Sequence, residues 1–131
     1  MTLTPHLVVN DGNAASAFYQ AAFGATETMR MPGEDGKRLM HCELKIGNQK
    51  LFLCDDFPEY CDGKLRSAKS IGNTPVTLHL EVPDCDAAMA KAEKAGATIT
   101  MPAQDMFWGD RYGKMQDPFG HDWGFSTPLK K

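Results

Sequence analysis

The chain has 131 residues, 42% of them hydrophobic, and a formal net charge of −3, which is typical of a single globular domain. Its basic residues form no dense run, which argues against nucleic-acid binding, and no apolar run reaches the length of a membrane span. The N-terminus lacks a signal-peptide pattern, and the four cysteines form no CxxC pair. We therefore expect a cytoplasmic protein with free thiols and no nucleic-acid or membrane partner.

The first part of the chain predicts the element order βαβββ. Alternating apolar residues predict a strand over residues 3–10, and a helix follows over 14–23, where Asp11 or Asn13 can cap its start and Gly24 its end. Turn residues such as Gly47 separate the next three predicted strands. These strands cover residues 27–31, 39–46 and 50–54.

Residues 55–74 show little periodicity and predict a linker, a lid or a partner contact, with a linker as the default. The βαβββ order then returns, with a helix over 86–95 that Asp84 can cap and Gly96 can end. Strands are predicted over 75–82, 98–102, 112–116 and 121–126. We therefore predict one α+β domain over residues 1–131, with unit one at 1–54, the linker at 55–74 and unit two at 75–131.

The two units also share sequence. Shifting the chain by 73 positions aligns residues 4–22 with 77–95, and nine of these nineteen positions are identical. After a one-residue deletion, residues 24–26 match residues 96–98. The repeat places His6 and His79 at equivalent positions, as a site shared by two modules requires.

Strand alternation predicts which side chains share a face. Leu78 and Leu80 face the helices, so His79 and Glu81 face the opposite side of the sheet. The same reasoning places several other polar or aromatic residues on the face away from the helices: His6, His41, Glu43, Phe52, Cys54 and Asp122. If the two units curve together into one mixed sheet with the helices outside, these residues line a cleft.

Six segments resemble the vicinal oxygen chelate superfamily, which includes glyoxalase I, bleomycin-resistance proteins, extradiol dioxygenases and fosfomycin-resistance thiol transferases. Within that superfamily the chain is most similar to the PhnB-like group, also labelled a 3-demethylubiquinone-9 3-methyltransferase-like domain. The segments cover residues 4–8, 17–25, 39–44, 76–82, 106–113 and 117–123. The resemblance implies two βαβββ units around a cleft, a small-molecule ligand and a homodimer.

The resemblance also implies a metal site with two histidines and two carboxylates, and His6 and His79 match the histidine positions. The carboxylate positions fall near Phe52 or Cys54 and at Gly124, none of which is acidic. Three protein ligands or more are usual in such sites. We therefore expect either one divalent ion (Zn, Ni, Mn or Fe) or no cofactor, with Glu43, Glu81 and Asp122 available as substitutes.

Other candidate residues carry a structural alternative beside the functional one. Glu81 and Glu43 are candidates for proton transfer, although each could be an ordinary strand carboxylate. Trp108 and Arg111 could contact a flat, partly anionic ligand or form a packing cluster. The other candidate ligand contacts are Phe52, Cys54 and Asp122.

Two functions follow from these residues. The first is an enzyme in which a metal on His6 and His79 stabilises an oxyanion while Glu81 or Glu43 moves a proton, as in a lyase, isomerase, oxygenase or thiol transferase. The second is a metal-free protein that binds or sequesters a small molecule. The missing carboxylates favour the second function, and the sequence alone does not name the ligand.

Overall fold

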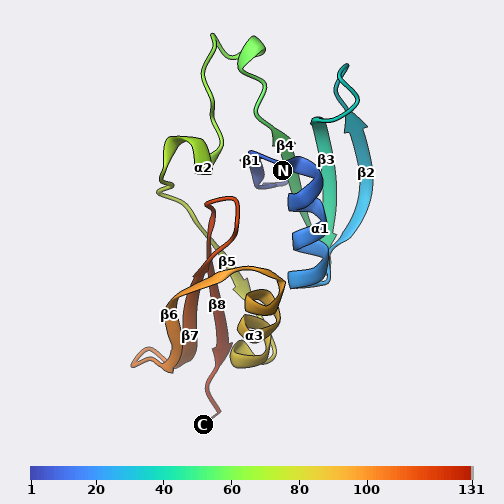
Figure 1. The fold of residues 1–131 in the computed structure, drawn as a ribbon. Helices are drawn as coiled ribbons and strands as arrows, with labels where there is room; N and C mark the ends of the chain where they lie inside the picture. The colour runs from blue at the N-terminus through green and yellow to red at the C-terminus, as the bar shows by residue number, and fades with distance from the viewer. Residues whose placement is uncertain (131) are drawn as a thin grey trace.

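The computed structural model describes residues 1–130 and contains two four-stranded mixed sheets (Figure 1). The first sheet has the strand order β1-β4-β3-β2, and the second has the order β5-β8-β7-β6. The first unit consists of β1 (His6–Val9), α1 (Gly12–Phe23), β2 (Thr26–Pro32), β3 (Leu39–Ile46) and β4 (Gln49–Asp55). The second consists of β5 (Thr77–Glu81), α3 (Cys85–Ala95), β6 (Thr98–Asp105), β7 (Asp110–Gln116) and β8 (Asp122–Pro128).

Both units therefore have the predicted order βαβββ, and the α+β class is confirmed. In each sheet the first strand pairs in parallel with the last strand of its own unit, and the other pairs are antiparallel. Strand β1 is shorter than predicted, because its regular pairing with β4 begins at His6. Strand β6 is longer than predicted and contains two register shifts opposite β7.

The repeat extends to the ends of the helices. The side chain of Asp11 accepts a hydrogen bond from the backbone N–H of Ala14, and Asp84 does the same for Ala87, each at 3.1 Å. Gly24 ends α1 with φ of 68°, a left-handed conformation that favours glycine. The equal spacing of these caps explains why the two units start and stop their helices at matching positions.

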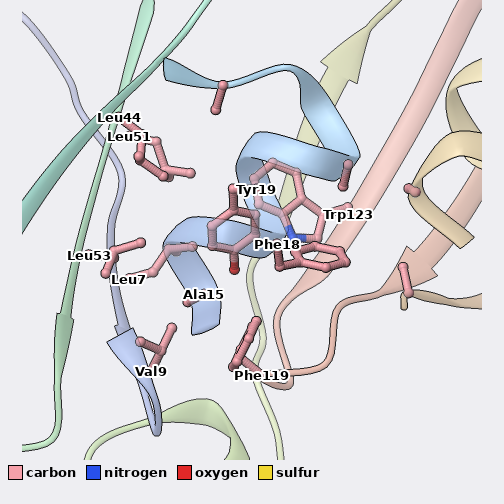
Figure 2. Packing of buried hydrophobic residues seen from close by; sticks show 14 of the residues in the cluster. Leu7, Val9, Ala15, Phe18, Tyr19, Leu44, Leu51, Leu53, Phe119 and Trp123 are labelled. Atoms are coloured by element: carbon pink, nitrogen blue, oxygen red, sulfur yellow. The ribbon is translucent and has the colours of Figure 1, made fainter. Parts of the chain in front are cut away.

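The core lies where the two units meet. Helix α1 packs on the first sheet, α3 packs on the second, and the two helices pack against each other (Figure 1). Figure 2 shows Tyr19 of α1 beside Trp123 of β8, with their ring centroids 5.6 Å apart. Within residues 1–130 the two sheets are not joined by strand pairing, so they do not close into the single curved sheet that the sequence suggested. The face of each sheet that points away from its helix carries no helix of its own unit.

The segment between the units contains two short helices, η1 (Pro58–Tyr60) and α2 (Ala68–Ile71). Asp56 organises this segment, because its carboxylate accepts hydrogen bonds from the backbone N–H groups of Arg66 (2.6 Å) and Ser67 (2.9 Å). Arg38 ties the segment to the β2–β3 loop through Glu59 at 2.6 Å. The predicted linker is thus folded against unit one, and its role as a lid or partner contact stays a prediction.

Candidate functional site

The outer face of the first sheet carries three rings and one carboxylate, which we call the first-sheet cluster: His6, His41, Phe52 and Glu43. The ring of Phe52 lies edge-on to both imidazoles, at centroid distances of 6.1 Å from His6 and 4.9 Å from His41. His41 Nε2 lies 3.0 Å from Glu43 Oε2. Burial lowers the pKa of His6, and a positive charge on nearby His41 lowers it further. His6 therefore favours the neutral form that stacks on or ligates a partner.

The outer face of the second sheet carries a second group, the second-sheet cluster: His79, Tyr112, Ser126 and Trp108. His79 and Tyr112 stack with centroids 5.9 Å apart and planes inclined by 16°. His79 Nε2 lies 2.8 Å from Ser126 Oγ, which fixes the orientation of the imidazole. Trp108 lies edge-on to Tyr112 at 5.8 Å and is 52% exposed. The cluster thus consists of a stacked ring pair, His79 and Tyr112, with the exposed ring of Trp108 beside it.

The predicted contact residue Arg111 lies elsewhere. Tyr112 faces outward, so its neighbour Arg111 faces the α3 side of the second sheet. There the Arg111 guanidinium forms ion pairs with Asp86 at 2.6 Å and Asp105 at 2.9 Å. The Arg111 guanidinium is therefore on the opposite face of the sheet from the second-sheet cluster, and two carboxylates already pair with it. Ligand binding by Arg111 stays a prediction without support from its position.

Three other candidates make no hydrogen bond or ring contact with the two clusters within residues 1–130, although Glu81 pairs with Ser126 in the strand register. Glu81 is exposed at the end of β5. Asp122 accepts a hydrogen bond from Gln116 Nε2 at 3.4 Å. Cys54 is half-buried, and burial raises the pKa of its thiol, with Asp55 raising it further. A thiol with a raised pKa is a weak nucleophile at neutral pH, so Cys54 is suited to packing rather than covalent catalysis.

Sequence reasoning missed the contributions of Tyr112 and Ser126. Alternation along β7 and β8 puts both on the same face as His79, and the register pairs them directly with each other. That register was the available signal, and it depends on the geometry of the β7–β8 turn over residues 117–121. His121 is half-buried, and its Nε2 lies 3.0 Å from the backbone oxygen of Val8.

The donor set of this chain does not fit the metal site that the resemblance implies. His6 and His79 lie on different sheets of one chain, and an ion held between two copies would still lack both expected carboxylates, because Phe52 or Cys54 and Gly124 occupy those positions. Within residues 1–130, no three histidine, cysteine or carboxylate side chains are grouped so that they could hold an ion. His79 Nε2 is engaged by Ser126, and Gly124 offers no donor. The side chains at these positions therefore do not form the donor set of a catalytic metal site.

His79 also borders a cavity of about 320 Å³ where the units meet. This cavity runs between β5 and the β3–β4 hairpin, with Leu80, Ile46 and Leu51 among its apolar lining residues. The recess therefore meets the second-sheet cluster at His79, and its size suits a small molecule.

Comparison with known proteins agrees with this architecture. The family model described as Glyoxalase/Bleomycin resistance protein/Dioxygenase superfamily matches residues 3–125. The chain belongs to this superfamily. The PhnB-like grouping stays a prediction. None of the helices described in residues 1–130 is both long and apolar enough to cross a membrane.

Three relatives show the range of similarity. An uncharacterized protein of Mycobacterium tuberculosis is 48% identical over 129 residues, which cover 98% of this chain and 75% of that protein. The crystal structure of an Arabidopsis thaliana gene product is 30% identical with a TM-score of 0.76, covering 96% of this chain and 98% of that one. The fosfomycin resistance protein FosX from Mesorhizobium loti shares the fold, with a TM-score of 0.66 and 13% identity over 98% of this chain and 92% of its own.

Proposed function

We propose that the protein binds a flat aromatic small molecule on its two ring clusters and that this binding requires no resident metal ion. The observation that carries the proposal is the ring group of the second-sheet cluster, in which His79 stacks on Tyr112 and the exposed Trp108 lies edge-on to Tyr112. Aromatic rings gain about 0.5–1.5 kcal/mol from stacked or edge-to-face pairing beyond the area that they bury. A flat ligand uses such a surface better than a chain-like one does.

The first-sheet cluster supports the same ligand class. His6, His41 and Phe52 form an edge-to-face group on the uncovered face of the first sheet. Beside it, Met29 and Met31 of β2 lie opposite Glu43 and His41 in the strand register, and both are exposed, at 36% and 49%. Flexible methionine side chains adapt well to aromatic surfaces. The cluster is thus a second apolar and aromatic surface.

We further propose a homodimer in which a second copy completes the cleft. The helices of each unit cover only one face of each sheet, so both clusters are uncovered in a single chain. A partner chain brings the first-sheet cluster of one copy opposite the second-sheet cluster of the other. Sedimentation-velocity measurements are expected to give twice the chain mass of 14.4 kDa. A concentration-independent monomer would contradict this arrangement.

The His41–Glu43 pair favours a second candidate function, a metal-independent enzyme. A carboxylate 3.0 Å from an imidazole nitrogen orients that ring and strengthens it as a base. In this function His41 and Glu43 move a proton on the bound ligand, and Glu81 stays a predicted alternative. Glu43→Gln would then abolish turnover of a true substrate while leaving its affinity nearly unchanged.

Ring binding is tested by titrating EDTA-treated protein with naphthalene, followed by ligand-observed NMR and tryptophan fluorescence. Tyr112→Leu is expected to raise the Kd about tenfold, because it removes the central ring of the second-sheet cluster. Tyr60→Leu is the matched control, since Tyr60 is 65% exposed in the linker and lies against Phe57. If naphthalene does not bind, or if both substitutions weaken binding equally, the proposal is wrong.

A further inference from the structure

The recess beside His79 has a polar mouth and an apolar interior. It is the cavity of about 320 Å³ between β5 and the β3–β4 hairpin, and its most buried lining residues are Leu51 and Trp123, each 3% exposed. The polar residues that line the cavity are all exposed: Gln49, Lys50, Thr77 and His79. A ligand in this recess therefore meets apolar walls inside and polar side chains where the recess opens to solvent.

The charge of the recess is positive and unbalanced. Lys50 lines the cavity, whereas no aspartate or glutamate of residues 1–130 does so. In the same part of the chain the Lys50 ammonium forms no ion pair. Arg111, the cation that the sequence suggested for an anionic ligand, is paired with Asp86 and Asp105 instead. Lys50 is therefore the cation that a ligand in this recess meets.

A second lysine increases the positive charge beside Lys50. Lys45 of β3 lies directly opposite Lys50 in the strand register. Such opposed residues share a face of the sheet, with Cβ atoms about 4.5–5.5 Å apart, and like charges placed this way destabilise a strand pair. The carboxylate on the same face of β3 belongs to Glu43, and its Oε2 lies 3.0 Å from His41 Nε2. An anion bound beside Lys50 relieves the repulsion between the two lysines.

We propose that the ring ligand carries an anionic group, such as a carboxylate, and that this group binds the Lys50 ammonium at the mouth of the recess. This inference rests on the proposed ring binding and names the ligand class, an aromatic acid. Because His79 belongs to the second-sheet cluster and also lines the recess, a ring on that cluster lies next to the cavity that Lys50 lines. The rings then supply stacking, and Lys50 determines the preference for charge.

The test compares probes that share one ring system on EDTA-treated protein: naphthalene, 2-naphthoate and 2-naphthamide. Naphthoate and naphthamide have nearly the same shape and differ in charge. Wild-type protein is expected to bind naphthoate about fivefold more tightly than naphthamide, as an ion pair near the protein surface predicts. Raising the ionic strength from about 0.05 M to about 0.5 M should reduce this preference, because salt screens exposed charges.

Substitution of Lys50 tests whether this one residue causes the preference. Lys50→Gln should reduce the preference to about twofold or less without changing the affinity for naphthamide, and Lys50→Glu should reverse it. Lys94→Gln is the matched control and should keep the preference, because Lys94 is exposed in the last turn of α3 and does not line the recess. Melting temperatures measured beside the affinities check that each variant is folded.

The outcomes separate this inference from ring binding itself. Equal affinities for naphthoate and naphthamide in wild type, or a preference that Lys50→Gln leaves unchanged, would overturn the anion site and leave ring binding standing if naphthalene binds. Equal losses of preference in Lys50→Gln and Lys94→Gln would show an effect of net charge alone, which also overturns the site. Failure of all the probes to bind would overturn both proposals.

Discussion

Replacement of Asp117 by leucine is expected to lower the free energy of unfolding by about 4 kcal/mol or more. The carboxylate of Asp117 is 4% exposed and accepts four hydrogen bonds. The donors are Tyr19 Oη (2.5 Å), Trp123 Nε1 (2.8 Å), Phe119 N (2.8 Å) and His121 N (3.0 Å). Leucine leaves all four donors without an acceptor, three of them buried, and each buried donor costs about 1–3 kcal/mol.

The Asp117 network also joins the two units, because Tyr19 belongs to α1 and Trp123 to β8. Burial raises the pKa of the Tyr19 hydroxyl, and the charge of Asp117 raises it further, so this hydroxyl stays a donor. Chemical denaturation of wild type, Asp117→Leu and Asp117→Asn measures the effect, with a smaller loss expected for asparagine. Asp122→Asn is the matched control on the same hairpin, with an expected change within about 0.5 kcal/mol. Equal losses at positions 117 and 122 would contradict this role of Asp117.

Replacement of Gly12 by alanine is expected to destabilise the protein by about 2–4 kcal/mol. A Cβ at this position would lie 2.4 Å from Asp55 Oδ2 and 3.1 Å from the Cβ of Leu39. Asp55 is 5% exposed, and its carboxylate accepts hydrogen bonds from the backbone N–H groups of Gly12 at 2.9 Å and Leu39 at 2.7 Å. The added methyl group displaces Asp55 and breaks both bonds.

Thermal and denaturant unfolding measure this loss, with Gly47→Ala as the control. An alanine Cβ at Gly47 would meet nothing within 4 Å, and that substitution costs only the strain of its φ of 59°, about 1 kcal/mol. A loss at Gly12 no larger than the loss at Gly47 would show that the contact with Asp55 does not constrain the fold. The repeat partner of Gly12 is Cys85, which has a side chain. The close contact between a glycine at the helix start and a strand carboxylate is therefore specific to unit one.

The order of the strands and helices was predictable because it depends on residues that are close together in the sequence. The Asp11 and Asp84 caps, the strand alternation and the repeat predicted the element order and the faces of the strands. The residues that alternate with the outward-facing Phe52 and Asp122 are accordingly buried: Leu51, Leu53, Trp123 and Phe125. The packing of α1 on α3 was not predictable, because it depends on side chains distant in sequence, such as Tyr19 and Asp117. That packing keeps the sheets separate and decides which residues share a site.

The candidate site was predictable in part for the same reason. Alternation placed His79, Glu43 and Phe52 on the outer faces, but it does not determine hydrogen-bond partners across strands. Glu81 was predicted to share a face with His79, whereas the residue that contacts the His79 imidazole is Ser126. Arg111 was predicted as a ligand contact because aromatic residues flank it in the sequence. Its position in β7 instead directs its side chain toward Asp86.

Metal content measured by mass spectrometry, after purification without chelators, tests the central claim most directly. Wild type and His79→Ala are both expected to contain far less than one equivalent of Zn, Ni, Mn or Fe per chain. Adding any of these ions to wild type should leave its melting temperature and its naphthalene affinity unchanged. One equivalent of metal in wild type that is lost in His79→Ala would contradict metal-independent binding and would favour the metal-assisted enzyme.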